Sequence, residues 1–332
     1  MQVILINRGR NLVQMNKSFV IEYPMRLDNK NSVFKRNFYY QKIFYQNLFE
    51  IIKEENISYR KIIISAHTDS LKEYNIATEI YLAYHKNNIK KNNAYSIKES
   101  YTLEEMCFDK TGYSGWAEMA NNKNLFDETQ NVNLDNAKKF VNEFFEIYKK
   151  NKLTKYEQSN LKTKLPSKFV LVALQVDNDT VNQLAYIQTY DLARFVLNAY
   201  KNSEYSVLIK PHPRDSKFNI SKVGCNNNNV VRDSLDCLLP KASAVYTVNS
   251  GVGFESLLYG KKVFTAGHND YHWVTTKVKT FNDIKSNIDA FDVDNDKILK
   301  FLYYYLNEYV VKYNDKDKIR NKIIKALKEF KI

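Results

Sequence analysis

Cysteine is scarce in this chain of 332 residues and forms no pattern: Cys107, Cys225 and Cys237 are an odd number, and no two stand as C-x-x-C. A disulfide framework or a structural zinc site needs paired or closely spaced cysteines, so neither is expected. Three separate thiols fit a reducing compartment, and we expect a cytoplasmic protein.

Long apolar runs are also missing. No segment approaches the roughly 18 uninterrupted apolar residues of a membrane span, although 44% of the residues are hydrophobic. The first residues, MQVILIN, hold too short an apolar run for a signal peptide and no small-residue cleavage site. They predict a first strand at Val3–Ile6 of a soluble protein that is not exported.

Acidic residues are outnumbered. The chain has 37 Asp and Glu against 50 Lys and Arg, a formal net charge of +13, and a pI near 9.3. Such a chain attracts polyanions: nucleic acid, an anionic membrane surface or anionic substrates. Most of the 25 Tyr and 19 Phe recur at core-like spacing, with no RNP-like or helix-turn-helix pattern. We expect no nucleic-acid partner, although a nonenzymatic polyanion binder stays an alternative.

Strand-like and helix-like segments alternate along the chain in two series. The first series predicts helices at 38–52, 74–88 and 134–151 and a buried strand at 61–67. A polar stretch, KLTKYEQSNLKTKLPSK, then ends near Pro166 and is typical of an interdomain linker. The second series predicts strands at 169–175, 205–213 and 244–248, separated by helices at 184–202 and 234–239.

Two successive β-α-β series predict an α/β fold of two Rossmann-type parallel-sheet domains that face a cleft. We expect domains at 1–165 and 166–299, with the C-terminal helices of 300–332 joining the first. In the last helix, an apolar stripe lies opposite a lysine-rich face. We expect this stripe to pack on the body; peripheral contact with an anionic inner membrane is the alternative. The stripe consists of Ile319, Ile323, Leu327 and Phe330.

In open parallel sheets, ligands bind at the carboxyl ends of the strands. Three predicted strand ends are unusually polar and read VDNDT (176–180), PHPR (211–214) and NSGVG (249–253). In the last, small residues at a helix start leave backbone N–H groups bare, which makes an anion site. Gly251 and Gly253 would admit a phosphate, Ser250 would donate a hydroxyl, and Glu255 would accept from a ribose. An ordinary turn that needs glycine for its dihedrals is the alternative.

His212 stands between two prolines, with Lys210 and Arg214 on either side. An imidazole held beside two cations suits a phosphate that departs with negative charge. A structural proline turn with a surface histidine is the alternative. Asp177 and Asp179 suggest a metal site, but a cationic phosphate site makes a metal redundant. One of them is a candidate nucleophile, unless both cap the next helix.

Together, the segments VALQVDNDT, LIKPHPR and VYTVNSGVGFESLLYGKKVFTAG resemble the capsule-polysaccharide synthesis family that includes the bacterial β-Kdo glycosyltransferases. The resemblance covers about residues 166–276, and ESYTLEEMCFDKTGYSGWAE is similar to a family segment of the first domain. It implies a GT-B-like enzyme that uses CMP-Kdo as donor, needs no metal or other cofactor, and takes part in capsule or lipopolysaccharide synthesis.

The resemblance also assigns residues. It implies that the CMP portion is held by His212, Pro213, Asn249, Ser250, Gly251 and Glu255, and our donor site adds Gln175, Lys210, Arg214 and Gly253. For catalysis it implies Asp179 as the nucleophile of a retaining reaction, with Thr180 in place of the usual serine. Glu99 matches an acidic position that would face the acceptor hydroxyl, and His212 has an electrostatic role. The acceptor would be a glycan, either free or lipid-linked.

A sialyltransferase-like enzyme that inverts configuration with another CMP-activated acid is the rival enzymatic interpretation. In that reaction a carboxylate serves only as a base. Turnover of CMP-Kdo against CMP-sialic acid separates the two.

Overall fold

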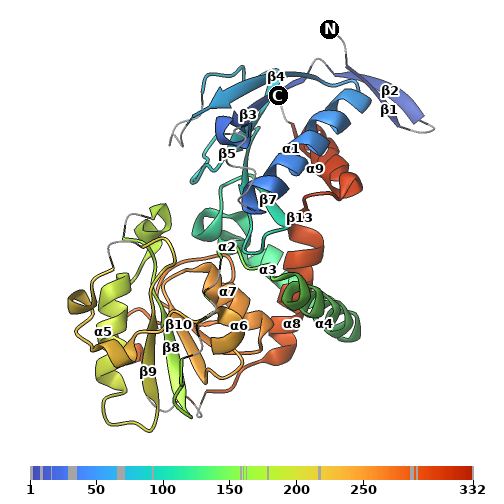
Figure 1. Cartoon of the computed structure of the whole chain (residues 1–332). Coiled ribbons are helices and arrows are strands. Elements are labelled where there is room, and N and C mark those ends of the chain that lie inside the picture. The colour runs from blue at the N-terminus through green and yellow to red at the C-terminus, as the bar shows by residue number, and fades with distance from the viewer. Residues whose placement is uncertain are drawn as a thin grey trace. The chain divides into compact units, whose positions relative to one another are not determined.

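The computed structural model describes residues 3–7, 10–15, 17–28, 36–65, 72–91, 93–157, 159, 161, 163–177, 179–215, 218–284, 288 and 291–330. It divides into two compact units, each with its own sheet (Figure 1). Unit 1 is Met1–Glu118 with Tyr305–Ile332, and unit 2 is Met119–Tyr304. Within the described ranges, none of the helices combines the length and apolarity that crossing a membrane would require.

Unit 1 is built on a six-stranded sheet in the order β13-β7-β6-β5-β3-β4. The four strands β4, β3, β5 and β6 are parallel, whereas β7 and β13 add antiparallel at one edge. The strands are β3 (Ser18–Pro24), β4 (Ser58–Ile64), β5 (Glu79–Tyr84), β6 (Ala94–Glu99), β7 (Glu105–Asp109) and β13 (Val311–Lys312). The expected first strand forms as β1 (Val3–Asn7), but it pairs with β2 (Arg10–Met15) in a separate two-stranded sheet.

The predicted helix at 74–88 is wrong, because its centre forms the strand β5. From Ile80 to Tyr84 every side chain is buried. A central parallel strand is covered on both faces and therefore shows no alternation, so it resembles a buried helix in sequence. The predicted strand at 61–67 corresponds to β4, but His67 lies outside the described residues.

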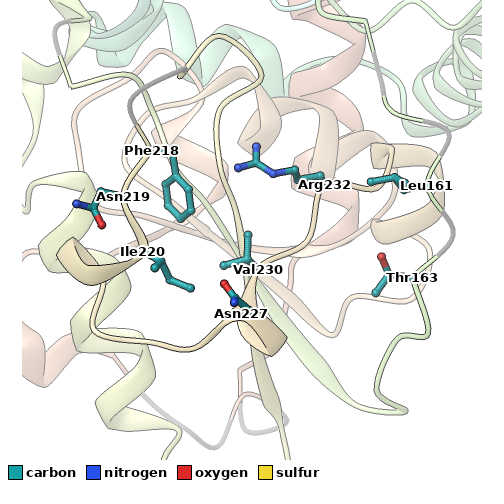
Figure 2. Close-up of a pocket in the computed structure, with 8 residues that line it drawn as sticks. All are labelled: Leu161, Thr163, Phe218, Asn219, Ile220, Asn227, Val230 and Arg232. Carbon is teal, nitrogen blue, oxygen red and sulfur yellow. The ribbon is translucent and has the colours of Figure 1, made fainter.

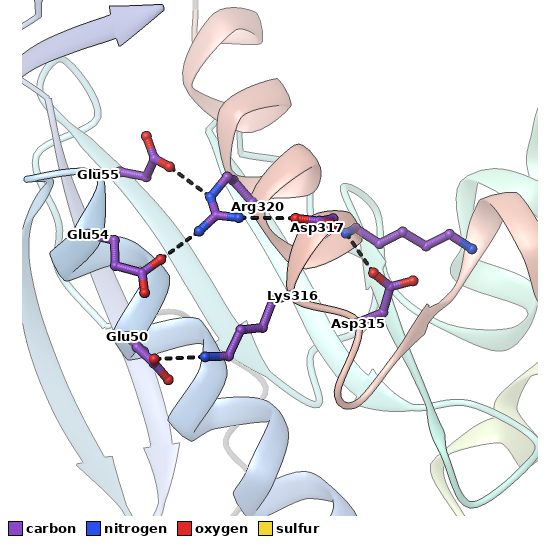
Figure 3. Close-up of polar contacts among 8 residues, drawn as sticks. Glu50, Glu54, Glu55, Asp315, Lys316, Asp317 and Arg320 are labelled. Atoms are coloured by element: carbon purple, nitrogen blue, oxygen red, sulfur yellow. Dashed lines mark hydrogen bonds and ion pairs between the residues drawn. The ribbon is translucent and has the colours of Figure 1, made fainter. Parts of the chain in front are cut away.

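Helices α1 (Arg36–Glu54) and α9 (Lys316–Glu329) lie side by side in unit 1, although they come from opposite ends of the chain (Figure 1). The whole predicted stripe of α9 is buried in the core that α1 shares. Figure 3 shows the polar rim of this contact: Arg320 bonds Glu54, the last residue of α1, and Glu55 directly after it, and Lys316 Nζ is 2.7 Å from Glu50 Oε1. The stripe of the last helix thus packs on the body.

Unit 2 contains a parallel sheet in the order β12-β11-β10-β8-β9. Its strands are β8 (Phe169–Ala173), β9 (Ser206–Lys210), β10 (Ala244–Thr247), β11 (Lys262–Thr265) and β12 (Thr276–Lys277). The predicted helices of this half form as α5 (Thr189–Ala199), α6 (Leu235–Leu238) and α7 (Gly251–Leu258). Helix α2 (Glu118–Asn121) begins at the last residue of unit 1 before the boundary, and α3 (Lys123–Gln130), α4 (Leu134–Asn151) and α8 (Asn295–Tyr304) lie in unit 2.

The division between the units falls at Glu118/Met119, whereas the sequence placed it at 165/166. Helices α3 and α4 pack against α8. Phe126 of α3 stacks on Trp273 with ring centroids 5.0 Å apart, and Lys300 of α8 donates to the Gln130 carbonyl at 2.9 Å. These contacts place residues 119–165 in unit 2. They join residues that are far apart in the sequence, so local sequence patterns do not reveal them.

Candidate functional site

The carboxyl ends of β9, β8 and β10 lie next to one another in the sheet of unit 2. From β8 the chain continues to β9 on one side and later reaches β10 on the other, so the connections diverge between β8 and β10. Open parallel sheets bind ligands at such a switch point. Gln175 and Asn249 follow these two strands and are buried. Gln175 Nε2 donates to Asn249 Oδ1 at 2.7 Å, and the Asn249 main-chain N–H donates to Gln175 Oε1 at 3.2 Å.

Asn249 also joins the loops on either side of it. Its Nδ2 donates to the carbonyl of Val181 at 2.9 Å and to that of His268 at 3.3 Å. Gln175 is in turn held by α5, because its main-chain N–H donates to Thr189 Oγ1 at 3.1 Å. The two amides therefore fix the loops after β8, β10 and β11, and they do so through bonds within the protein.

Helix α7 begins at this edge of the sheet. Ser250 is its N-cap and accepts a hydrogen bond from the Val252 N–H at 3.3 Å, and Gly251 is the first helical residue. A Cβ at Gly253 would lie 2.5 Å from the hydroxyl of Tyr271, which donates to the Ser250 carbonyl at 2.6 Å. Gly253 is therefore required by the packing of Tyr271 under the helix start. The Val252 and Gly253 N–H groups both donate to Ser250, so the expected anion site depends on the other N–H groups of the first turn.

The cationic residues of the candidate site lie at the end of β9. The ammonium of Lys210 is buried and donates to the Asp233 carbonyl at 2.6 Å; burial lowers its pKa to about 8. In the turn that continues through Pro213, His212 Nδ1 accepts from the Arg214 N–H at 3.1 Å. With Nδ1 an acceptor, the neutral imidazole carries its proton on Nε2. Burial lowers the pKa of His212, so the neutral donor form is favoured.

The segment after α4, which the sequence suggested as a linker, crosses these strand ends. Tyr156 packs against His212, and the Arg214 guanidinium lies 4.9 Å from the centre of the Tyr156 ring. Further along, the Thr163 N–H donates to Asp233 Oδ1 at 2.7 Å. Sequence reasoning missed Tyr156, for which an aromatic residue in a polar stretch was the available signal.

Glu255 of α7 is 4% exposed and lies beneath this segment. Its carboxylate accepts hydrogen bonds from the Tyr148 hydroxyl at the end of α4 and from the Thr154 side chain. Burial raises the pKa of Glu255 to about 7. A ribose contact from Glu255 would require an exchange of these bonds.

The two aspartates after β8 are both exposed but differ in their partners. Asp177 forms an ion pair with Lys222 at 3.1 Å. Asp179 accepts from the Val181 N–H at 3.3 Å and so caps a short 3-10 helix, as the capping alternative expected. Asp179 is also close enough to His212 for its negative charge to raise the pKa of the imidazole, against the lowering that burial causes. Among the described residues, no three or more His, Cys, Asp or Glu side chains are grouped to hold a metal ion.

Glu99 ends β6 in unit 1 and belongs to a partly buried polar cluster. The Tyr84 hydroxyl donates to Glu99 Oε2 at 3.4 Å, and Arg26 donates to the same hydroxyl. Beneath them, Gln41 Nε2 and the Tyr45 hydroxyl are buried with no hydrogen-bond partner among the residues that the structure describes. Sequence reasoning missed Tyr84, which donates to the carboxylate, and Arg26, which donates to Tyr84.

Comparison with known proteins identifies a family for part of the chain. Residues 121–275, all in unit 2, match the family of capsule polysaccharide biosynthesis proteins. The resemblance that the motifs of 166–276 indicated is thereby confirmed. Protein FixF of Sinorhizobium fredii (strain NBRC 101917 / NGR234) is 31% identical over 159 residues. That alignment covers 43% of this chain and 38% of FixF, so the chain spans about two fifths of its length.

Two solved structures of KpsC from Thermosulfurimonas dismutans match most of the chain. The beta Kdo 2,7 transferase superposes with a TM-score of 0.54 at 14% identity, covering 94% of this chain and 99% of that chain. The beta Kdo 2,4 transferase gives a TM-score of 0.48 at 13% identity, covering 93% and 98%. The first likeness confirms the predicted α/β, GT-B-like fold with two parallel-rich sheets and C-terminal helices.

Proposed function

We propose that this protein, in which residues 121–275 match the capsule polysaccharide biosynthesis proteins, is a glycosyltransferase that moves Kdo from CMP-Kdo to a glycan acceptor with retention. The observation that carries the proposal is the convergence of Asp179, His212 and the Ser250-capped start of α7 at three neighbouring strand ends. Anion donors and a carboxylate at one sheet edge suit a donor with a phosphate leaving group.

The donor phosphate would lie between α7 and His212. The first N–H groups of α7 and the helix dipole provide donors. The Nε2–H of His212 and the guanidinium of Arg214 add charge-assisted or polar contacts. Lys210 contributes its charge from below while its ammonium stays bonded to Asp233. In this scheme, fixed donors and basic side chains supply the positive potential, and the reaction uses neither a metal nor another cofactor.

The chemistry would proceed by two displacements. A carboxylate oxygen of Asp179 attacks the anomeric carbon of Kdo while the bond from that carbon to the phosphate oxygen breaks, and CMP leaves with the electron pair. The acceptor hydroxyl then attacks the same carbon, Glu99 takes the hydroxyl proton, and the carboxylate of Asp179 leaves. Two inversions give net retention.

Incubation of the purified protein with CMP-Kdo and candidate glycan acceptors, followed by NMR of the product, tests this function. We expect release of CMP together with a Kdo glycoside that keeps the donor's anomeric configuration. A product of inverted configuration would instead support the sialyltransferase-like interpretation. No turnover of CMP-Kdo with any acceptor, free or lipid-linked, would contradict the proposal. A lipid-linked acceptor would place the enzyme at the cytoplasmic face of the inner membrane as a peripheral protein.

A further inference from the structure

Unit 1 buries polar groups next to Glu99 that the proposed mechanism does not use. The open cleft of about 700 Å³ in unit 2 (Figure 2) differs from them, because it lies beside β9 and belongs to the candidate site described above. In unit 1, Glu99 is partly exposed, whereas Gln41 of α1 and Tyr84 of β5 are both 0% exposed. Because a fully buried side chain does not touch a substrate, Gln41 can influence the reaction only through a neighbouring residue.

The Tyr84 hydroxyl lies between two acceptors but has a single proton. It is 3.3 Å from Gln41 Oε1 and 3.4 Å from Glu99 Oε2. Both distances exceed the roughly 2.7–2.8 Å that is usual for a hydroxyl bonded to one oxygen. Arg26 donates to the same hydroxyl and does not compete for its proton, since a guanidinium has no acceptor. Tyr84 therefore completes one of these two bonds at the expense of the other.

The side-chain amide of Gln41 has two orientations that differ in what they offer Tyr84. Its Nε2 is buried with no hydrogen-bond partner in the described part of the chain, so a half-turn of the amide breaks no bond on that side. The last torsion of a glutamine side chain is broad and roughly two-fold, so both orientations are accessible. After the half-turn, Nε2 would donate to the Tyr84 hydroxyl. Oε1 would then be available to Tyr45, one helical turn along α1, whose hydroxyl is likewise unpartnered within the described ranges.

These two orientations suit the two charge states of Glu99. A carboxylate attracts the Tyr84 proton more strongly than an amide oxygen does, because a hydrogen bond to a charged acceptor is the stronger one. Gln41 can then turn its Nε2 toward Tyr84. When Glu99 carries a proton, the amide oxygen of Gln41 becomes the competitive acceptor. The Tyr84 proton stays on Tyr84 in both states, so only hydrogen bonds are exchanged.

Charged and titratable groups reach Glu99 from several elements of unit 1. Arg26 follows β3, Tyr45 belongs to α1 and Tyr84 to β5, and the charges of this cluster act on one another. On β7, the residue in register with Glu99 is the uncharged Met106. Burial raises the pKa of Tyr45 and of Tyr84, so both hydroxyls keep their protons, and Arg26 stays charged. Glu99 is thus the member of this cluster whose charge changes.

We propose that Gln41 positions Glu99 through Tyr84: the amide of Gln41 turns as Glu99 gains or loses its proton, so that Tyr84 donates to the carboxylate and to Gln41 when Glu99 is protonated. The inference rests on the proposed function, in which Glu99 takes the proton of the acceptor hydroxyl. Gln41 and Tyr84 are then positioning residues. Together they set how readily Glu99 accepts a proton.

Carbon NMR titration of protein labelled at the glutamate side-chain carboxyl tests the proposal, with the Glu99 signal assigned by its loss in Glu99→Gln. Tyr84→Phe removes a donor to the carboxylate, so the pKa of Glu99 should rise. Gln41→Leu removes the acceptor that competes when Glu99 is protonated, so the pKa should fall. Each change should be on the order of 0.5 to 1, as expected for one hydrogen bond.

The matched control is Tyr95→Phe, which removes another tyrosine hydroxyl that donates to a carboxylate. Tyr95 lies on β6 with Glu99 but bonds Glu329 at 3.2 Å, so this variant should leave the Glu99 titration unchanged. Gln41→Met guards against misfolding, because it keeps the length of the side chain and removes the same polar atoms. It should unfold near the wild-type temperature and give the same fall in the pKa of Glu99.

The kinetic test uses CMP-Kdo with a glycan acceptor. The acid limb of the dependence of kcat on pH should move up in Tyr84→Phe and down in Gln41→Leu. Equal directions in the two variants, reversed directions or no NMR shift would overturn the Gln41 proposal and leave the proposed function standing. NMR shifts without movement of the acid limb would overturn the positioning role. No turnover of CMP-Kdo by the wild type would overturn the proposed function itself, whatever the NMR titration gives.

Discussion

The ring of Tyr156 packs edge-on against the imidazole of His212, with centroids 4.8 Å apart and an angle of 75° between the planes. Tyr156 lies in a segment that the sequence suggested as a linker between domains. In the folded unit it instead covers one side of His212, and burial lowers the pKa of that imidazole. His212 is thus a neutral Nε2–H donor at physiological pH.

Replacing His212 with alanine should slow CMP-Kdo turnover by at least about tenfold, because the proposed hydrogen bond to the phosphate would be lost. His212→Gln keeps an N–H donor and should recover part of the rate. Since the pKa of His212 lies below its ordinary value of 6.5, CMP affinity should not fall as the pH rises from 7 to 8. Steady-state kinetics and titrations at both pH values check this. Unchanged kinetics of His212→Ala would remove His212 from the site.

Glu255 makes stability depend on pH. Its pKa is raised from 4.5 to about 7, so between these values the folded protein keeps a proton that the unfolded chain releases. The free energy of unfolding should therefore fall as pH rises from 4.5 to 7, by on the order of 3 kcal/mol at most. In Glu255→Gln, the amide still accepts from Tyr148, and this part of the pH dependence should disappear.

Urea unfolding at pH 5 and pH 7 measures this effect. Glu105 in unit 1 is the matched control, because burial raises its pKa to about 8 and gives the same sign. Glu105→Gln should leave the Glu255 contribution in place. An equal pH dependence in the wild type and Glu255→Gln would show that the carboxyl is ionised throughout.

Gly253 and Tyr271 should be coupled in stability. In Gly253→Ala the new methyl would lie 2.5 Å from the Tyr271 hydroxyl and 3.0 Å from Thr247 Cγ2. Crowding of this kind costs roughly 1–3 kcal/mol. Tyr271→Phe removes the closest atom but also the hydrogen bond to the Ser250 carbonyl. The double variant should therefore lose less unfolding free energy than the sum of the single losses. Urea denaturation of the four proteins measures the coupling, and additive losses would exclude the contact.

The strands and helices of unit 2 could be predicted because their patterns are local. Buried runs at 169–175 and 244–248 were recognised as strands, and α4 was found from its helical spacing. The same rules failed at Ile80–Tyr84, since a strand buried on both faces has no alternation to read. The unit boundary failed for another reason: the contact of Phe126 with Trp273 joins residues far apart in sequence.

The sequence predicts where the candidate site lies better than it predicts the contacts within the site. The strand-end rule brought Gln175, His212 and Asn249 to one edge of the sheet, as the structure has them. It did not foresee that Gly253 makes room for Tyr271, or that Gly260 ends α7 with a φ of 64°. Nor did it foresee the burial of Glu255, because that depends on Tyr148, which lies 107 residues away. The spacing of residues in the sequence indicates where a strand ends. The residues that contact this strand end come from distant parts of the chain.

The last prediction concerns Asp179 and Glu99. Asp177 is paired with Lys222, whereas Asp179 is exposed and bonded through one oxygen to a backbone N–H, so Asp179 is the better placed nucleophile. CMP leaves with little proton assistance, but the acceptor hydroxyl must lose a proton. Removing Glu99 should therefore slow discharge of the covalent intermediate more than its formation.

Intact-mass spectrometry of Glu99→Ala after exposure to CMP-Kdo should show one added Kdo. Because the proposed adduct is an ester of Asp179, adding Asp179→Asn should abolish it, whereas the matched change Asp177→Asn should leave it in place. Loss of the adduct with Asp177→Asn and its persistence with Asp179→Asn would reverse the assignment of the nucleophile. If Glu99→Ala instead forms product at the wild-type rate, the acceptor proton is taken by another group. Since an ester to Asp179 is required by two displacements and by no single displacement, the adduct decides between the retaining and the inverting reaction.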